Sequence, residues 1–119
     1  MSAPRFRLVP GGRLVHEPGR GGVGWRLLGA NNRELGRSAL AYADAEAALA
    51  AIGDVRVLAA GGGAHIVHNP TTGRWAWHLI TAYDLVVATS GRGFRHEREC
   101  RYNLEQFRAH APSATVVDA

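Results

Sequence analysis

The sequence contains no lysine, a single cysteine and no long apolar run. The lone cysteine, Cys100, excludes an internal disulfide and is typical of a reducing compartment. A helix that spans a bilayer needs about 18–20 consecutive apolar residues, so no membrane partner is expected. Residues 1–10 lack the apolar segment and the cleavage site of a secretory signal. We therefore expect a cytoplasmic protein.

The remaining composition is that of a small folded domain with a basic surface. The residues are 46% hydrophobic and 20% charged, which excludes a disordered chain. The length of 119 residues excludes a large multidomain enzyme. All 14 basic residues are arginine, and the net charge is +4. Two interpretations of this arginine content stay open, a GC-rich genome and selection for bidentate contacts to phosphate. The charge permits nucleic-acid binding without requiring it.

The chain repeats itself at an interval of 52 residues. This shift places residues 14–52 on residues 66–104 without a gap, and 8 of the 39 aligned pairs are identical, against about 2–3 expected by chance. A tryptophan recurs at Trp25 and Trp77, which is informative because tryptophan is rare. The sequence therefore predicts a single domain, 1–119, made of two repeats that span residues 13–60 and 65–117.

Hydrophobic alternation with a period of two, bounded by turn residues, predicts several short strands in each repeat. The first repeat is expected to contain strands at 13–17, 23–29 and 34–38, and the second at 65–69, 74–80 and 85–90. One more strand is expected after each helix, at 55–59 and 114–117, and another at 5–9, whose place in the sheet the pattern does not give. Turns are predicted at 18–21, 31–32, 70–73 and 83–84.

The spacing of apolar residues becomes helical after the third strand of each repeat. Asp44 is placed to cap a helix over 45–52, with Gly53 as its stop, and a second helix is predicted over 96–110, before Pro112. The pattern predicts an α+β fold, with both helices on one face of an antiparallel sheet. The strand faces and helix stripes predict a core of Trp25, Leu27, Leu49, Ile52, Trp75, Trp77, Leu79, Cys100, Leu104 and Phe107.

Each repeat carries the same short signature: Trp-x-Leu, a strand that ends in serine, an aromatic residue and a helix. The copies are Trp25-Arg26-Leu27, Ser38 and Tyr42, and then Trp77-His78-Leu79, Ser90 and Phe94. Over residues 14–117 this pattern resembles the YegP-like proteins, tandem copies of a small bacterial domain of unknown function. The resemblance implies two β3–α units that form one sheet, with the strand after each helix crossing to the other unit. It implies no catalytic residue.

Two glycine motifs and the histidines are interpreted as structural features. Gly19-x-Gly21-x-x-Gly24 matches a dinucleotide fingerprint, but a strand is expected where that motif needs a helix. Gly61-Gly62-Gly63 is expected to link the repeats. His65 and His68 would point to opposite faces of a strand, and pairing His16 with His68 supplies two ligands where zinc needs three or four. We predict no metal site and no cofactor.

No residue of the sequence is a good candidate for catalysis. Cys100 lies on the apolar stripe of the second helix, where we expect a small buried hydrophobe rather than a nucleophile. Glu17, Asp84 and Glu105 are scattered and show no pairing that suits acid–base chemistry. The sequence therefore predicts a protein that is not an enzyme.

Arginines supply the candidates for a binding surface. Arg26, Arg74 and His78 are expected on the sheet face opposite the tryptophans. A basic run opens the second helix, with Arg92, Arg95, Arg98 and Arg101 as its members. The helical pairs Arg95–Glu99, Glu97–Arg101 and Arg101–Glu105 would neutralise much of this run, which favours a solvated helix face.

These observations predict a non-catalytic binding or interaction module, monomeric rather than dimeric, with a protein or a nucleic acid as its partner. A protein would bind to the open sheet face or to an edge strand. The first alternative function is nucleic-acid binding through the arginine-bearing open face. The second alternative, a small-ligand carrier or an enzyme, would need a pocket with converging polar groups.

Overall fold

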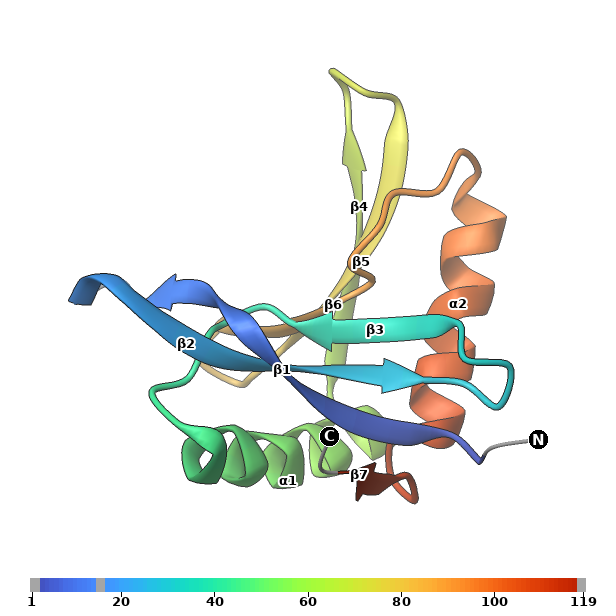
Figure 1. Ribbon diagram of the computed structural model, residues 1–119. Helices are drawn as coiled ribbons and strands as arrows, with labels where there is room; N and C mark the ends of the chain where they lie inside the picture. Colours follow the sequence, from blue (N-terminus) through green and yellow to red (C-terminus); the bar gives the residue numbers. More distant parts are fainter. Residues whose placement is uncertain (1–2, 15–16, 118–119) are drawn as a thin grey trace.

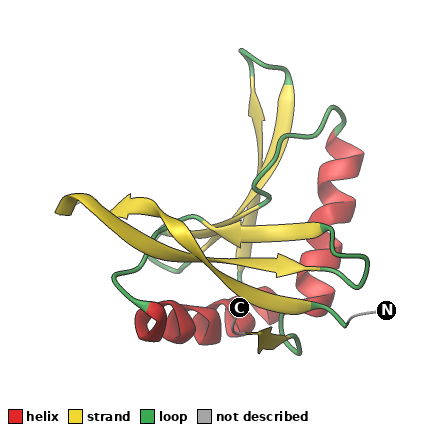
Figure 2. Ribbon diagram, viewed as in Figure 1, coloured by secondary structure: helices red, strands yellow, loops and turns green. Residues whose placement is uncertain are grey.

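The computed structural model describes residues 3–14 and 17–117, which form one seven-stranded sheet and two helices (Figures 1 and 2). The elements are β1 (Arg5–Leu14), β2 (Glu17–Leu28), β3 (Glu34–Ser38), α1 (Ala45–Gly61), β4 (Gly63–Asn69), β5 (Arg74–Ile80), β6 (Val86–Thr89), α2 (Glu97–His110) and β7 (Thr115–Val117). The predicted α+β class is confirmed. Within the described ranges, neither helix is long and apolar enough to cross a membrane.

The sheet runs in the order β4-β5-β6-β3-β2-β1-β7. β3 and β6 pair at its centre, where Arg37 lies opposite Thr89, and they join the two halves of the chain. β1 and β7 are parallel, whereas every other neighbouring pair is antiparallel. The prediction of a wholly antiparallel sheet is therefore wrong at this edge, because the chain that leaves α2 reaches the outer edge of β1 and runs in the same direction as β1.

The strand β1 extends well beyond the segment expected at 5–9. β2 in turn begins at Glu17, so the turn predicted at 18–21 lies inside a strand. Glycine and proline usually interrupt strands, but the β1–β2 ladder accommodates them through irregularities in register that follow Pro10 and Arg13. A long, bulged hairpin thus forms where the sequence indicated a turn.

The strand predicted at 13–17 does not form one element, because its two ends belong to β1 and β2. His16, which the sequence pairs with His68, lies outside the described residues. The expected glycine linker at 61–63 is divided between the end of α1 and the start of β4. The predicted turn at 70–73 is confirmed, with Gly73 in the left-handed region at φ 72°.

The helix α1 begins where the sequence predicts and ends later. Asp44 caps it, and its Oδ1 accepts a hydrogen bond from the backbone N–H of Ala47 at 2.8 Å. The helix continues through Gly53, so the strand predicted at 55–59 is helical and does not cross to the other half of the sheet. The next strand, β4, pairs with β5 instead. The helix persists because its buried stripe continues through Ala48, Ile52, Val55 and Ala59.

The helix α2 begins within one residue of the prediction, which placed it over 96–110. At its first turn the backbone N–H of His96 donates to Oε1 of Glu99 at 3.3 Å, as in a capping box. The helix ends just before Pro112, which cannot continue it. The buried residues of α2 are Cys100, Asn103 and Phe107.

One hydrophobic core joins both helices to the sheet. Trp75 and Leu104 are half-buried and pack against this core. Leu49, which the sequence places in the core, is 44% exposed, because the buried stripe of α1 passes through Ala48 and Ile52 instead. The other residues expected in the core are fully buried, namely Trp25, Leu27, Ile52, Trp77, Leu79, Cys100 and Phe107.

Phe107 lies between the two central tryptophans. Its ring centroid is 4.7 Å from that of Trp77 and 6.3 Å from that of Trp25. Gly36 of β3 faces this cluster, and a Cβ added there would lie 2.7 Å from Cδ2 of Phe107 and 2.8 Å from Cη2 of Trp77. The close approach of α2 to the sheet therefore depends on the missing side chain at Gly36.

Replacing Gly36 by alanine should destabilise the protein by about 1–3 kcal/mol, because the added methyl overlaps a packed ring. Gly53→Ala is the matched control, since a Cβ there meets no atom within 4 Å. This control should stabilise α1 by about 0.5–1 kcal/mol. Urea denaturation measures both free energies of unfolding. A loss of stability in the control as large as that in Gly36→Ala would contradict the close packing at β3.

Candidate functional site: an arginine-lined groove

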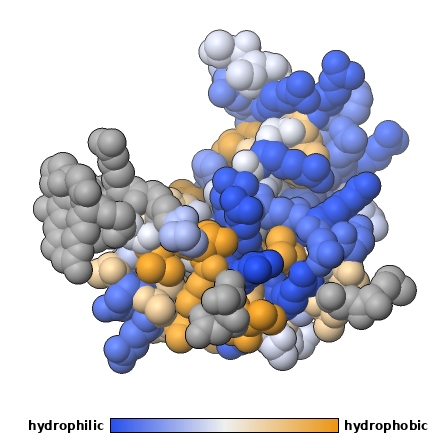
Figure 3. Space-filling view, in the orientation of Figure 1, coloured by the Kyte–Doolittle hydropathy of each residue, from blue (hydrophilic) through white to orange (hydrophobic). Residues whose placement is uncertain are grey.

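A long groove runs between α2, the β2–β3 turn and the loop that joins β6 to α2. Its volume is about 1100 Å³, and we call it the α2 groove. Figure 3 shows that hydrophilic side chains dominate the side of the molecule on which α2 lies. Leu35 and Phe94 supply apolar parts of the wall. The basic residues that line the groove are Arg33, Arg74, Arg92, Arg95, Arg98 and His110.

Arginines from separate segments converge on the α2 groove because the β6–α2 loop lies directly against the start of β5. A Cβ added at Gly93 would lie 2.7 Å from Cβ of Arg74, so a side chain at Gly93 would push the loop away. In the same loop, the guanidinium carbon of Arg92 lies 4.8 Å from the ring centroid of Phe94. This cation–π contact holds Arg92 over the buried Phe94 ring, at the wall of the groove.

The expected neutralisation of the α2 arginines is largely missing. Of the helical pairs predicted from sequence, Arg101–Glu97 forms, with 3.4 Å between Nε and Oε2. Arg95–Glu99 and Arg101–Glu105 do not form in the described part of the chain, so the prediction of a neutralised helix face is wrong there. One physical reason is that Glu99 instead accepts a hydrogen bond from the backbone N–H of His96.

The arginines of the α2 groove consequently keep their charge available. Among residues 3–10 and 22–117, whose side chains the structure describes, no carboxylate lies within 4 Å of the guanidinium nitrogens of Arg33, Arg74, Arg92, Arg95 or Arg98. Glu34 and Glu99 are the acids in the groove lining. Glu34 is already engaged by Arg26 and Arg37. The groove therefore carries an excess of positive charge.

The buried amide of Asn103 lines the same groove. Asn103 is 7% exposed, and its Oδ1 accepts a hydrogen bond from the indole Nε1–H of Trp77 at 2.6 Å. Because an indole N–H can only donate, this bond fixes the oxygen toward Trp77 and leaves the amide nitrogen on the other side. That nitrogen donates no hydrogen bond to the described residues, and it is not among their buried atoms that lack a partner, so it is open to solvent at the groove.

The remaining lining of α2 is polar and uncharged. Tyr102 is 63% exposed and Gln106 is half-buried, and both line the α2 groove. The sequence analysis missed Tyr102, Asn103 and Arg33 as binding candidates. A signal for Asn103 was present, because a polar residue stands between Cys100 and Phe107 on the stripe predicted to be buried.

Arg26 and His78 lie apart from the groove, in a row of side chains that crosses the sheet. Residues that are directly opposite in neighbouring strands share a face, and successive pairs connect β4 to β1. We call this the transverse row, and its members are His65, His78, Thr89, Arg37, Arg26 and Arg7. The predicted binding residues thus separate into two groups, one in the groove and one in this row.

Glu34 neutralises part of the transverse row. Its Oε1 lies 3.1 Å from Nε of Arg26, and its Oε2 lies 2.8 Å from Nη2 of Arg37. Two guanidinium groups therefore share one carboxylate. The row keeps less positive charge than its arginines suggest.

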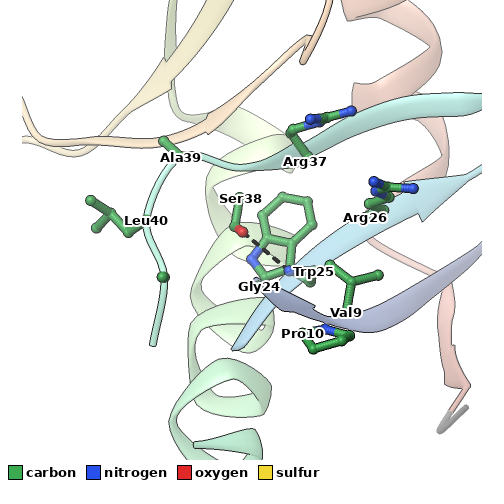
Figure 4. A pocket seen from close by; sticks show the side chains of 10 residues that line it. Val9, Pro10, Gly24, Trp25, Arg26, Arg37, Ser38, Ala39 and Leu40 are labelled. Carbon is green, nitrogen blue, oxygen red and sulfur yellow. Dashed lines mark hydrogen bonds between the residues drawn. The ribbon is translucent and has the colours of Figure 1, made fainter. Parts of the chain in front are cut away.

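A smaller cavity of about 280 Å³ lies beside Arg26 and Arg37 (Figure 4). Ser38 points toward Trp25, and its Oγ accepts a hydrogen bond from the backbone N–H of Trp25 at 3.1 Å. The indole Nε1 of Trp25 is buried with no partner in the described part of the chain. The cavity lies below the range of about 300–1,000 Å³ that is typical of small-molecule sites.

The histidines that the structure describes belong to no group of three or more potential metal ligands among the described residues. His65 lies opposite His78 in the β4–β5 ladder. His68 instead packs against Trp75, with ring centroids 4.4 Å apart. The Gly19–Gly24 motif lies within β2, so no helix follows it to meet a pyrophosphate.

Cys100 is fully buried on α2, and burial raises the pKa of its thiol from its ordinary 9.0 to about 11. The nearby Arg101 lowers this pKa and Glu97 raises it, each by less than burial does. A thiolate is the reactive form, so this thiol is poorly suited to act as a nucleophile.

The raised pKa of Cys100 predicts a loss of stability at alkaline pH. Between about pH 9 and pH 11 the unfolded chain gives up a proton that the folded chain keeps, so the free energy of unfolding should fall as the pH rises. Tyr42, whose pKa is raised by burial and by Asp54, acts in the same direction above pH 10. Urea denaturation across this range, with Cys100→Ala as the comparison, measures the effect. A fall of the same steepness in both proteins would exclude Cys100 as a cause.

Comparison with known proteins identifies a shared fold. No protein-family model and no curated protein matches the sequence. The structure of yegP from E. coli, a protein of unknown function, superposes with a TM-score of 0.76 at 17% identity, over 99% of this chain and 94% of that one. A UPF0339 protein from Shewanella oneidensis superposes with a TM-score of 0.76 at 12% identity, over 98% of this chain and 92% of that one. This chain therefore shares the overall fold of these two structures.

Proposed function

We propose that the chain belongs to the YegP-like family, contains an internal duplication and acts as a non-catalytic binding module. The fold shared with yegP over nearly the whole chain supports the family. Backbone features that recur 52 residues apart support the duplication. These are the isolated bridges Val23–Tyr42 and Trp75–Phe94, and the left-handed residues Asn32 and Asp84.

We further propose that the two helices cover the same face of the sheet. α1 contacts β1, β2 and β5, and α2 contacts β3, β4 and β5. The two helices also contact each other and share one core with the tryptophan face. The transverse row would then lie on the uncovered face. The parallel pairing of β7 with β1 supports an exchanged strand after the second helix.

The ligand that suits the α2 groove best is a nucleic acid. One observation carries this proposal: five arginines from separate segments line one groove and have no carboxylate partner among the described residues. Guanidinium groups bind phosphate oxygens in bidentate fashion, and such contacts release condensed counterions. The affinity should therefore depend steeply on salt concentration.

Arg98→Ala tests this function against a control on the same helix, Arg101→Ala. Arg98 lines the α2 groove, whereas Arg101 does not line it and pairs with Glu97. Each substitution removes one positive charge from α2. Fluorescence anisotropy with mixed-sequence DNA and RNA oligonucleotides, titrated between about 50 and 200 mM salt, reports the affinity.

We expect Arg98→Ala to weaken binding several-fold and to reduce the slope of log affinity against log salt by about 1. Arg101→Ala should leave both quantities close to those of the parent protein. Equal effects of the two substitutions would show that a positive charge on α2 contributes to binding whether or not it lines the groove. Failure to bind any oligonucleotide at the lowest salt would overturn the nucleic-acid proposal.

The transverse row is the second candidate surface, as an open sheet face. The register alignment of Arg7, Arg26 and Arg37 with His65 and His78 favours it. We rank it below the groove because Glu34 neutralises part of its charge. Arg26→Ala should leave nucleic-acid affinity nearly unchanged if the groove is the site. A larger loss of affinity in Arg26→Ala than in Arg98→Ala would reverse this order.

A further inference from the structure

We infer that the α2 groove takes the unpaired nucleotides of a single strand, with bases inside the groove and phosphates at its arginines, and does not take a duplex. This inference rests on the proposed function and specifies its ligand. It depends on the oriented amide donor of Asn103, the exposed side chain of Tyr102 and the arginines that line the groove.

The amide nitrogen of Asn103 is a hydrogen-bond donor in the lining of the groove. It lines the groove from a side chain that is 7% exposed, and the bond from Trp77 holds its orientation. Because this nitrogen is open to solvent at the groove, an acceptor on a bound ligand can replace the water there. The edge of an unpaired base offers such a group, with carbonyl and ring-nitrogen acceptors.

A duplex cannot present its bases to this donor. Its base edges lie inside its own grooves, about 8.5 Å deep on the major-groove side, and proteins read them with convex helices or strands. The α2 groove is concave and would meet the outer phosphates of a duplex. A duplex held there would leave the amide nitrogen of Asn103 to water and the exposed ring of Tyr102 without a base to stack on.

Tyr102 and Arg92 provide flat surfaces for bases at the groove wall. Tyr102 is 63% exposed and lines the groove, so its side chain is accessible to a ligand there. The guanidinium of Arg92 is already held over the ring of Phe94, at 4.8 Å from the centroid. Bases stack on tyrosine rings and on guanidinium planes in single-strand binding proteins.

Charged and uncharged side chains of α2 and its preceding loop follow one another along the groove. Arg95 precedes the helix and Arg98 lies in its first turn, whereas Tyr102, Asn103 and Gln106 follow toward the C-terminal end. From Glu97 to Gln106 the helix rises by about 14 Å, which is enough for a short run of nucleotides. Phosphates can therefore contact the arginines at the start of α2, and Arg33 of the β2–β3 turn, while bases meet the uncharged side chains.

The test compares three ten-nucleotide probes at about 100 mM salt: a mixed-sequence single strand, its duplex, and an abasic strand with the same number of phosphates. Fluorescence anisotropy should show the single strand to bind at least tenfold more tightly than the other two. Similar affinities for all three probes, still weakened by Arg98→Ala, would overturn this inference and keep the proposed function. No binding by any probe would overturn both.

Tyr102→Ala adds a test at residue level, with Tyr83→Ala as its matched control. Tyr83 is 93% exposed in the β5–β6 turn and does not line the groove. Tyr102→Ala should weaken single-strand binding about tenfold, as expected for one lost stacking contact. Tyr102→Phe should keep most of the affinity, and Tyr83→Ala all of it. An affinity that Tyr102→Ala leaves unchanged would contradict the base-stacking role.

Discussion

Replacing Trp77 by alanine is expected to lower the free energy of unfolding by about 3–5 kcal/mol. The side chain is fully buried, and its ring centroid lies 4.7 Å from that of Phe107. Its indole N–H also donates a hydrogen bond to Oδ1 of Asn103. The substitution would leave a large cavity and a buried acceptor without its partner, and each carries a cost. Urea denaturation followed by circular dichroism measures the loss.

Trp75→Ala is the matched control for this prediction. Trp75 lies on the same strand, β5, but is half-buried and packs against His68 at the end of the β4–β5 hairpin. Its replacement should cost clearly less than that of Trp77. Unchanged stability in Trp77→Ala would place the indole at the surface and contradict the described core.

Phe107→Ala is expected to cost a similar amount, about 3–5 kcal/mol, because Phe107 connects the two halves of the core. Its ring contacts both Trp25 and Trp77 from α2 and lies directly over Gly36. Removing it would separate α2 from the centre of the sheet. A loss below about 1 kcal/mol in urea denaturation would show that the helix is held elsewhere.

A double-mutant cycle between Gly36 and Phe107 tests the same contact more directly. The methyl added by Gly36→Ala overlaps the ring of Phe107, so a smaller residue at Phe107 should relieve part of the clash. Gly36→Ala combined with Phe107→Leu should therefore cost less than the sum of the single substitutions, by about 0.5–3 kcal/mol. Strict additivity would contradict the contact. Trp77 lies equally close to Gly36 and limits the relief.

Much of the second half of the fold follows from local sequence signals. β5 carries alternating large apolar residues, and the turn before it contains Gly73 in the left-handed region. α2 carries a buried stripe and ends before Pro112. The core tryptophans were predictable because their strand alternates and because Trp25 and Trp77 recur at one interval.

The first half of the chain was less predictable because its local signals conflict with tertiary pairing. Glycine and proline at 18–21 indicate a turn, but the hairpin with β1 holds them in an extended ladder. Gly53 suggests a helix end, but burial of Val55 and Ala59 continues α1 beyond it. In both places the formation of long-range contacts outweighs an unfavourable local propensity.

The candidate site was only partly predictable. The arginines of the basic run were identified from sequence, but their helical spacing to acids suggested neutralisation. The capping contact of Glu99 with the backbone of His96 changes that outcome. Asn103 stood out as a polar residue on the buried stripe, but its orientation was not predictable, because it depends on Trp77, which is 26 residues away in the chain. Convergence of Arg33 and Arg74 on α2 depends on the sheet order, which no local pattern encodes.

An NMR titration with the ten-nucleotide single strand tests the central claim, that the α2 groove is the binding site. The indole N–H of Trp77 is a natural reporter, since it donates to Asn103 at the groove, whereas that of Trp25 lies buried elsewhere. We predict shifts in the Trp77 indole, the Asn103 side-chain amide and the backbone amides of Arg95 and Arg98. Shifts confined to the transverse row, or no shifts at low salt, would contradict the account.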